Sequence, residues 1–304
     1  MIDLYSAMDE IVSSIPRGRV STYRLAALAL GDPIAARAFA ARAASMPETA
    51  PYHRLVASDG RVGEFRDRPG LKARLLSSEG VQVIEGRVNL GKYLFEDLPR
   101  LGILGRLREE QERVRRGIRL EPLGEVHRIA AVDVAYAGDR AFAAAVIADL
   151  GGRVLETRTA VTEVRFPYIP TYLSYRELEP MLGALEGLEF DLILVDGNGV
   201  LHPRGVGIAS HLGVLLGAPT IGVAKSLLVG EVVGDRVFLD GEPRALVFGY
   251  GRRKYYASPG HLCTLEDVRR ILEPLMTKGG PSPLVAADRI SKELKRRFMR
   301  HGVA

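Results

Sequence analysis

The stretch "RIAAVDVAY" (residues 128–136) decides the fold of the larger part of this chain. It is an apolar, strand-like run that is interrupted by one acid, Asp133. A second such run, "LILVDG" (192–197), ends on Asp196. A carboxylate in an apolar strand is costly to bury unless it is paired or bound to a metal. Taken singly, Asp133 can be a structural hydrogen-bond acceptor and Asp196 a turn cap.

The elements around these runs predict a mixed α/β fold. Expected strands lie at 128–136, 141–150 and 153–164, followed by a helix, a strand, a helix and a strand at 171–186, 190–197, 206–217 and 219–224. Two final helices are expected at 264–276 and 284–299. This order matches the ribonuclease H-like arrangement, in which the first strand lies beside the fourth. Asp133 and Asp196 would then converge at strand ends, where two hard oxygen ligands with room for waters suit Mg²⁺.

The first 90 residues have a different, helical pattern. Apolar residues at helical spacing predict a helix over 3–15, and "TYRLAALAL" (22–30) predicts a second that ends at Gly31. Asp32 and Pro33 can begin a third helix, which gives a helix-turn-helix. "YHRLVASDGRVGEF" (52–65) predicts a hairpin with an Asp-Gly turn, the wing of a winged helix. A weakly patterned segment at 87–98 is the expected linker, so we expect domains at 1–93 and 97–304.

Composition restricts the class of protein. The 304 residues suit two domains, and the single cysteine, Cys263, excludes an internal disulfide and a cysteine-based zinc site. A cytoplasmic location is the default for such a chain, and its N-terminus is unlike a signal peptide. The net charge of +5 permits a polyanionic partner. We expect a monomer that makes no use of a membrane.

Three motifs give the second domain a specific resemblance. "FPYIPTYLSYRE" (166–177), "LVDGNGVLHPRGVGIASHLG" (194–213) and "TIGVAKSLLVG" (220–230) occur in that order. Together they closely resemble endonuclease V, a ribonuclease H-like, metal-dependent nuclease that nicks nucleic acid near deoxyinosine. The resemblance covers about residues 98–300. It implies catalytic acids at Asp133, Glu177 and Asp196, further catalytic residues at His202 and Lys225, and a last metal ligand at Asp288.

The same resemblance implies residues that contact DNA. The strand-separating wedge falls on Pro167, Tyr168, Ile169 and Pro170, and the inosine pocket on Leu173, Gly197 and Gly222. Tyr168 between two prolines is held rigidly, as a residue that enters a base stack must be, although an ordinary core tyrosine is the alternative. Gly222 can equally be a turn glycine. Two departures from the family pattern are Thr171, where a Gly is usual, and Val285, where an Arg is usual.

The chemistry of the remaining site residues is consistent with phosphodiester hydrolysis. Mg²⁺ can polarise the phosphate and acidify water. Lys225, in an apolar run, would place a point charge near the phosphate, with a surface lysine as the alternative. Glu177 could hold a metal-bound water or a second ion. His202 could shape the base pocket or assist proton transfer, and a packed histidine in the "HPR" turn is the alternative.

Residues 1 to about 90 resemble the DNA-binding domain of O6-alkylguanine-DNA alkyltransferases. The resemblance lies in "IPRGRVSTYRLAALALG" (15–31), "AARA" (35–38), "PYHRLVASDGRVG" (51–63) and "LKARLLSSEG" (71–80). Tyr52 occupies the position of the acceptor cysteine, as another residue does in the alkyltransferase-like proteins, which bind alkylated guanine without repairing it. The resemblance implies DNA contacts from Tyr23, which would rotate the target phosphate, Arg37, which would fill the gap of a flipped base, and Arg54.

Two further positions bear on this domain. Glu79 follows position 52 by 27 residues, as the family's His-orienting Glu follows its cysteine. The Asn that closes the family's binding loop is absent, because "SMPETAP" (45–51) is shorter and has Met46 there. The frame of "PYHRL" (51–55) is therefore predicted to serve binding, without transfer chemistry.

These observations predict a DNA-repair endonuclease that cuts 3′ to deoxyinosine with Mg²⁺, leaving 3′-hydroxyl and 5′-phosphate ends, and that carries a non-catalytic alkylguanine-binding domain. One alternative is a non-enzymatic lesion sensor with a vestigial nuclease, against which the intact Asp133, Glu177 and Asp196 argue. The other is a nuclease acting on inosine in RNA, since the choice of nucleic acid rests on contacts to the 2′-hydroxyl.

Overall fold

The computed structural model describes residues 2–65 and 68–301, and the chain divides into two compact units. Unit 1 comprises Met1–Glu109 with Arg165–Pro170, and unit 2 comprises Glu110–Val164 with Thr171–Ala304. The division falls inside helix α6 (Ile103–Gly117). Each unit is described by itself. Among the described helices, none combines the length and the apolarity needed to cross a membrane.

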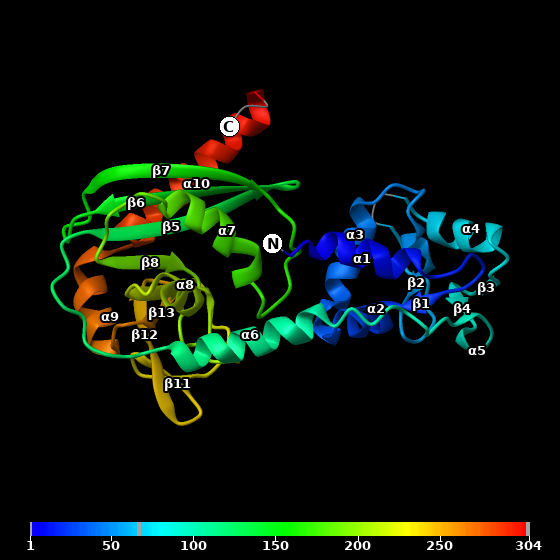
Figure 1. The fold of residues 1–304 in the computed structure, drawn as a ribbon, viewed down its shortest axis with the longest axis horizontal. Coiled ribbons are helices and arrows are strands. Elements are labelled where there is room, and N and C mark those ends of the chain that lie inside the picture. Colours follow the sequence, from blue (N-terminus) through cyan, green and yellow to red (C-terminus); the bar gives the residue numbers. More distant parts are fainter. Residues whose placement is uncertain (1, 66–67, 302–304) are drawn as a thin grey trace. The chain divides into compact units, whose positions relative to one another are not determined.

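Unit 1 is mainly helical (Figure 1), and side-chain caps begin α1, α2 and η1. The apolar residues of α1 and of the turn after it (Leu4, Met8, Ile11, Val12 and Ile15) are all fully buried, which confirms the predicted helical face. Thr22 accepts from the Leu25 N–H at 3.1 Å and caps α2, which ends at Gly31 with φ +105°. The elements are α1 (Leu4–Ser13), β1 (Ser21–Thr22), α2 (Tyr23–Leu30), η1 (Pro33–Ala35), α3 (Ala36–Ser45), η2 (Pro51–Arg54), β2 (Leu55–Val56), α4 (Leu71–Ser78), β3 (Val83–Ile84), β4 (Arg87–Val88) and α5 (Leu90–Tyr93).

Two expectations for unit 1 are wrong. The segment predicted as a wing hairpin begins with the 3₁₀ helix η2, and β2 pairs with β1 in parallel. The Asp-Gly turn is present, closed by the Ala57 N–H to the Arg61 carbonyl at 2.9 Å, but no ladder continues from it. The expected linker at 87–98 is also packed, because Val88 and Tyr93 belong to a buried cluster with Val20 and Leu76.

Unit 2 is a nine-stranded mixed sheet with helices on both faces (Figure 1). The predicted neighbourhood of the first and fourth strands is confirmed, since β5 and β8 pair in parallel with Val132 opposite Val195. The strands are β5 (Ile129–Ala137), β6 (Arg140–Ala148), β7 (Val154–Glu163), β8 (Leu192–Asp196), β9 (Thr220–Ala224), β10 (Glu231–Val233), β11 (Arg236–Leu239), β12 (Glu242–Tyr250) and β13 (Arg253–His261), in the order β10-β11-β12-β13-β9-β8-β5-β6-β7. Strands β10 to β13 were not predicted from the sequence.

Alternate side chains of the central strands enter two different cores. Ala131, Leu194 and Val223 face α9 and α10, whereas Val132 and Val195 face α7 and α8. The four helices are α7 (Ser174–Leu185), α8 (Ile208–Leu216), α9 (Leu265–Leu272) and α10 (Ser282–His301), with η3 (Glu273–Leu275) and the short pair β14 (Met276–Thr277) and β15 (Gly280–Pro281) before α10. The carboxyl ends of β5, β8 and β9 therefore lie between two helical layers.

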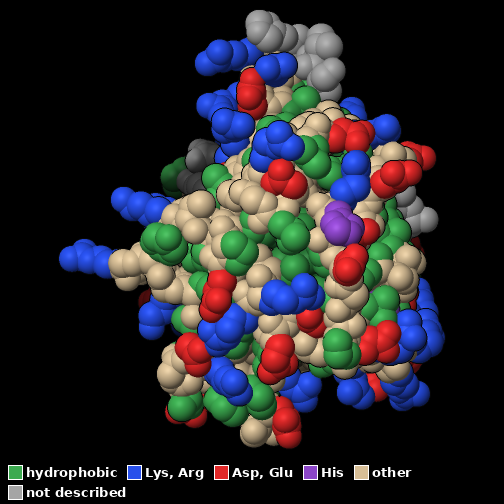
Figure 2. All heavy atoms as spheres, turned by 90° about the vertical axis from the view of Figure 1, so that its left-hand side faces the viewer, with side chains coloured by type: hydrophobic (Ala, Val, Ile, Leu, Met, Phe, Trp, Pro, Cys, Tyr) green, Lys and Arg blue, Asp and Glu red, His purple; other side chains and the backbone are tan. Residues whose placement is uncertain are grey.

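The surface of unit 2 carries both signs of charge. Figure 2 shows acidic and basic side chains mixed over the end of the unit that carries α9, with basic side chains gathering at the top. The top corresponds to the second half of α10, where exposed cations follow one another at Lys292, Arg296, Arg297 and Arg300. A polyanion therefore has a basic helix to approach next to the sheet.

Candidate metal centre and nucleic-acid contacts

Asp133 and Asp196 are brought side by side by the parallel pairing of β5 and β8. Each follows directly after the paired residues Val132 and Val195. Asp133 is buried, and its Oδ2 accepts from the Ser291 hydroxyl at 2.7 Å. Asp196 is partly exposed, and its Oδ2 accepts a short hydrogen bond from the Lys225 ammonium. The structure thus brings together two of the predicted ligands and the predicted lysine.

Asp288 enters the same cluster from α10. Its Oδ1 lies 2.7 Å from the Lys292 Nζ and 4.0 Å from the Lys225 Nζ. The Lys225 ammonium consequently lies between the carboxylates of Asp196 and Asp288. A cation already occupies the position to which these acids converge.

Glu177 stands in the first turn of α7 and is held by a tyrosine of β5. The Tyr136 hydroxyl donates to Glu177 Oε1 at 3.0 Å. Burial raises the pKa of Glu177 to about 8; the Tyr136 hydrogen bond opposes this, and repulsion from Asp133 and Asp196 adds to it. Burial likewise raises the pKa of Asp133 to about 6, opposed by Ser291 and reinforced by Asp196 and Asp288. The four acids therefore repel one another across one site.

The donor set fits a hard divalent cation. Carboxylate oxygens with room for waters are the ligands of Mg²⁺, and a divalent charge would relieve the repulsion among these acids. Within the described residues, no three acidic, histidine or cysteine side chains already enclose a single position for an ion. Asp196 and Asp288 instead point to lysines, so binding requires these ammonium groups to give way.

His202 is buried and neutral near neutral pH. Burial, together with the nearby Arg204 charge, lowers its pKa to about 4. Its Nδ1 accepts from the Arg204 N–H at 3.2 Å. Among the described contacts none joins His202 to the carboxylates, so its role in proton transfer or in the base pocket stays a prediction.

The two pocket glycines are packed tightly against the chain itself. Gly197 has φ +152°, and an added Cβ would lie 2.5 Å from Ile208 Cγ2. A Cβ on Gly222 would lie 2.4 Å from the Gly199 nitrogen, because the loop after β8 crosses directly over β9. These positions need glycine for packing alone, and their contact with a base stays a prediction.

Of the wedge residues, Tyr168 alone is exposed, between the buried Pro167 and Ile169. Tyr168 is 65% exposed, whereas Ile169 is 1% and Phe166 2% exposed. The segment 165–170 groups with unit 1, and the Arg165 carbonyl accepts from the Leu4 N–H at 2.9 Å. Tyr168 is therefore not a core tyrosine.

Thr171, where the family pattern has a Gly, stands at φ +67°. A β-branched residue rarely adopts this left-handed conformation, which costs about 1–3 kcal/mol. Its carbonyl accepts from the buried Gln111 side chain at 2.8 Å and from Arg204 at 3.3 Å. These bonds hold the turn that leads to Leu173, the half-buried N-cap residue of α7.

In unit 1, the residue that replaces the acceptor cysteine is part of the core. Tyr52 is 1% exposed, and its hydroxyl donates to Asp9 Oδ1 at 2.6 Å. Arg42 binds the same carboxylate, with its Nη2 2.7 Å from Asp9 Oδ2. Burial and the Asp9 charge raise the pKa of the Tyr52 phenol, so it stays protonated.

The neighbouring residues of "PYHR" converge on Glu79. Arg54 donates to both carboxylate oxygens, and His53 Nε2 lies 3.0 Å from Oε1. Burial opposes ionisation of Glu79, but hydrogen bonds from Arg54, His53 and Gly18 outweigh it and lower the pKa to about 2. Arg54 is thus a structural partner in this cluster, whatever DNA contact it makes.

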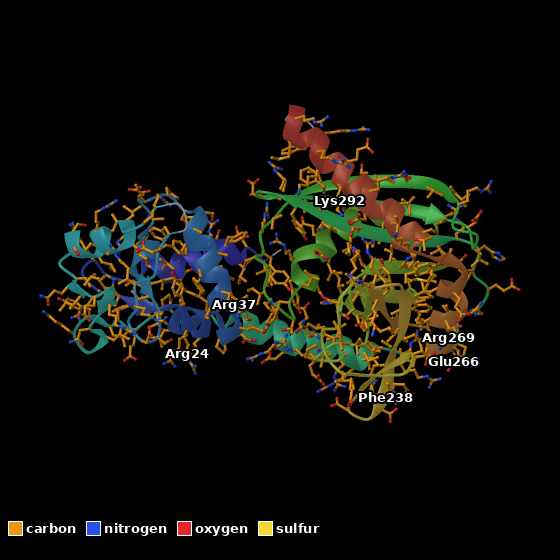
Figure 3. The ribbon with its side chains drawn as sticks, turned by 180° about the vertical axis from the view of Figure 1, so that it is seen from behind. Arg24, Arg37, Phe238, Glu266, Arg269 and Lys292 are labelled. Atoms are coloured by element: carbon orange, nitrogen blue, oxygen red, sulfur yellow. The ribbon has the colours of Figure 1, made fainter. Side chains whose placement is uncertain are left out.

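Tyr23 and Arg37 lie on different helices of unit 1. Tyr23 begins α2, and its hydroxyl accepts from Lys72 at 2.9 Å. Lys72 is 1% exposed, and burial lowers its pKa to about 8. Arg37 projects from α3 into solvent, and Figure 3 labels it together with Arg24 of α2.

Comparison with known proteins agrees with both units. Residues 111–289, more than half of the chain, match the family model of endonuclease V. Residues 3–81 match that of the 6-O-methylguanine DNA methyltransferase DNA-binding domain. The chain belongs to the endonuclease V family.

Individual relatives match all or part of this endonuclease V chain. A bifunctional methyltransferase/endonuclease of Picrophilus torridus is 34% identical over 292 residues, which are 95% of this chain and 96% of that protein. The crystal structure of endonuclease V from Streptomyces avermitilis is 33% identical, with a TM-score of 0.59, covering 64% of this chain and 94% of that one. Endonuclease V of Ciona intestinalis, solved with DNA containing an inosine followed by a ribo-adenosine, is 27% identical, with a TM-score of 0.58, covering 64% and 98%.

Several residues of the endonuclease V site were missed from the sequence. Ser291 and Lys292 follow Asp288 by three and four residues on α10, a spacing that places side chains on one helix face and could have indicated them. Tyr136 gave no such signal, because its bond to Glu177 depends on how α7 packs on β5. In unit 1, the bonds of Lys72 to Tyr23 and of Asp9 to Tyr52 likewise depend on tertiary packing and were missed.

We predict that Glu79→Gln lowers the free energy of unfolding of unit 1 by about 3 kcal/mol at pH 7. The pKa of Glu79 is about 2 in the folded chain, against about 4.3 when unfolded. Its stabilisation is therefore complete above the unfolded value and is lost as the pH falls towards 2. Urea denaturation followed by circular dichroism should show the difference from wild type shrinking to about half at pH 3.

Glu48→Gln is the matched control. Glu48 pairs with Arg68 at 3.4 Å on the surface, so its loss should cost less than about 1 kcal/mol at either pH. An equal effect of Glu79→Gln at pH 7 and pH 3 would contradict the role given to its charge.

Proposed function

We propose that this chain is a Mg²⁺-dependent endonuclease that cuts a DNA strand 3′ to deoxyinosine, on a ribonuclease H-like sheet. The observation that supports it most is the pair Asp133 and Asp196 at neighbouring strand ends, with the Lys225 ammonium between Asp196 and Asp288. Membership of the endonuclease V family adds support, as does the Ciona intestinalis relative solved with inosine-containing DNA.

The residues take roles that follow from their surroundings. Asp133, Asp196 and Asp288 would hold Mg²⁺, which polarises the scissile phosphate and acidifies a water. Lys225 would exchange its partner Asp196 for a phosphate oxygen and stabilise charge there. Glu177, which the Tyr136 hydroxyl positions, has a pKa raised to about 8. It would hold the attacking water and, in its deprotonated form, accept a proton from it.

Recognition of the lesion is assigned to residues other than the metal ligands. Tyr168 would enter the base stack, because its ring is exposed while its neighbour Ile169 anchors the segment. Leu173, Gly197 and Gly222 would line the inosine pocket, and the neutral His202 would shape its wall. Attack by water with the 3′ oxygen as the leaving group would leave a 3′-hydroxyl and a 5′-phosphate.

The test is cleavage of labelled strands carrying deoxyinosine, with Mg²⁺ or with EDTA. Wild type should nick 3′ to the lesion only with Mg²⁺. Asp133→Asn and Asp196→Asn should each lose at least about a hundredfold in rate while still binding the strand, because each removes a metal ligand. Asp235→Asn, which removes an exposed carboxylate paired with Arg269, should cut like wild type.

Two results would overturn the assignment. Binding of the inosine strand without any Mg²⁺-dependent cut would make the chain a lesion sensor. Faster cutting of inosine in RNA than of deoxyinosine in DNA would make RNA its substrate.

For unit 1 we propose recognition of O6-alkylguanine in DNA without alkyl transfer. Transfer needs a thiolate, and unit 1 contains no cysteine. Tyr52 is buried, protonated and bound to Asp9, so it supports the site from the core and is not a nucleophile. Arg37, exposed on α3, would enter a base stack, and the Tyr23 hydroxyl, which accepts from Lys72, would donate to the phosphate.

The full chain should bind an O6-methylguanine duplex more tightly than the unmodified duplex, and it should not remove a labelled methyl group. Arg37→Ala should lose most of this preference, whereas Arg74→Ala, at an exposed position on α4, should keep it. Fluorescence anisotropy with both duplexes measures the ratio. Equal affinity of wild type for the two would show that unit 1 is only a scaffold or a general DNA-binding domain.

A further inference from the structure

A cavity of about 620 Å³ opens beside the metal-site acids. One wall contains Asp196, Lys225 and Asp288 of the cluster already described. The lining also includes Arg252 of the turn between β12 and β13 and the first two residues of β13, Arg253 and Lys254. The cavity therefore continues from the proposed cleavage centre towards a second group of cations.

The lining of the cavity contains more positively than negatively charged side chains. Five cations face two carboxylates, and those two are already bound by Lys225 and Lys292. Lys292, labelled in Figure 3, comes from α10. Arg252, Arg253 and Lys254 are exposed, and no described carboxylate lies within 4.0 Å of their charged ends. These three cations remain available to a polyanion.

The lining between these two groups is built from packed residues. The Tyr255 hydroxyl donates to the Lys278 carbonyl at 3.2 Å, and its ring would lie 3.1 Å from a Cβ added to Gly280. This joins β13 to the segment that leads into α10 and Asp288. Arg253 precedes Tyr255 by two residues on β13, so it lies on the same face of the sheet. The strand that carries Arg253 is thus joined to the segment that leads to Asp288.

The cavity and the glycine loop lie on opposite faces of β9. Gly222 faces the loop at Gly199, whereas its neighbour Val223 lines the cavity. A strand whose lesion is held at the glycine loop reaches the cavity only after it has passed the acids. If the chain cuts 3′ to the lesion, the nucleotides beyond the cut lie over the cavity.

We propose that Arg252, Arg253 and Lys254 bind backbone phosphates of the strand on the 3′ side of the cleaved bond, a step that rests on the proposed function. Arg253, on the cavity face next to Tyr255, is the principal contact. These contacts keep the departing 5′-phosphate strand in register with the cleavage centre. Phosphate contacts position a strand without reading its sequence.

The test compares inosine strands that end one nucleotide beyond the cut with strands that extend about ten nucleotides further. For wild type with Mg²⁺, kcat/KM should fall at least about tenfold on shortening, since one phosphate contact of this size is worth about 1.4 kcal/mol. Arg253→Glu should lose about tenfold or more on the long strand and little on the short one. On the long strand, kcat/KM of this variant should fall less steeply with rising salt concentration than that of wild type. The difference in slope should correspond to about one lost phosphate contact.

Arg236→Glu is the matched control, because Arg236 is an exposed arginine of the same sheet that does not line this cavity. It should leave both rates near those of wild type. Circular dichroism of both variants confirms that unit 2 is folded.

Two outcomes would overturn the inference alone. The first is that wild type cuts long and short strands equally well. The second is that Arg253→Glu loses the same factor on both, which would place its effect in the cleavage centre. If wild type cuts no inosine strand of any length, the proposed function fails and this inference falls with it.

Discussion

The arrangement of groups around the site in unit 2 depends on repulsion among four carboxylates, those of Asp133, Glu177, Asp196 and Asp288. The parallel pairing of β5 and β8 places Asp133 beside Asp196, and burial of Asp133 disfavours its charged form. The surrounding elements each supply a compensating group: Lys225 after β9, Ser291 and Lys292 on α10, and Tyr136 on β5. In the proposed function, the same convergence of the acids provides the ligands of a divalent cation.

The sequence predicted this centre better than it predicted the sheet around it. Asp133 and Asp196 stand out because an acid in an apolar strand needs a partner, and alternation along β5 fixes which neighbours face each core. Strands β10 to β13 were missed although Gly-Asp and Asp-Gly turns separate them, because the strands are only partly apolar. The 87–98 segment was read as a linker because Val88 and Tyr93 are spaced for neither helix nor strand. The contacts of Tyr136 and Lys72 depend on packing between distant elements, which no local pattern encodes.

Unit 1 shows how a reactive position becomes part of a core. Where the related DNA-binding domain carries its acceptor, Tyr52 lies against Asp9, which Arg42 also binds. The frame around it persists, since His53, Arg54 and Glu79 form one hydrogen-bonded cluster. A rigid frame without a thiol can recognise a base, and the bond-breaking chemistry then rests with the acids of unit 2. In the proposed function, unit 1 recognises alkylguanine without chemistry, whereas unit 2 carries both the inosine pocket and the cleavage centre.

The central claim is that the acids of unit 2 form a divalent cation site in which the Lys225 ammonium stands in for the ion. Calorimetric titration of Mg²⁺ into the full chain without nucleic acid tests it most directly. Asp196→Asn should bind at least about tenfold more weakly than wild type, because it loses one charged ligand. Lys225→Gln should bind about tenfold more tightly, because the competing charge is gone and about 1.4 kcal/mol corresponds to that factor. Unchanged affinity in both variants would contradict the account.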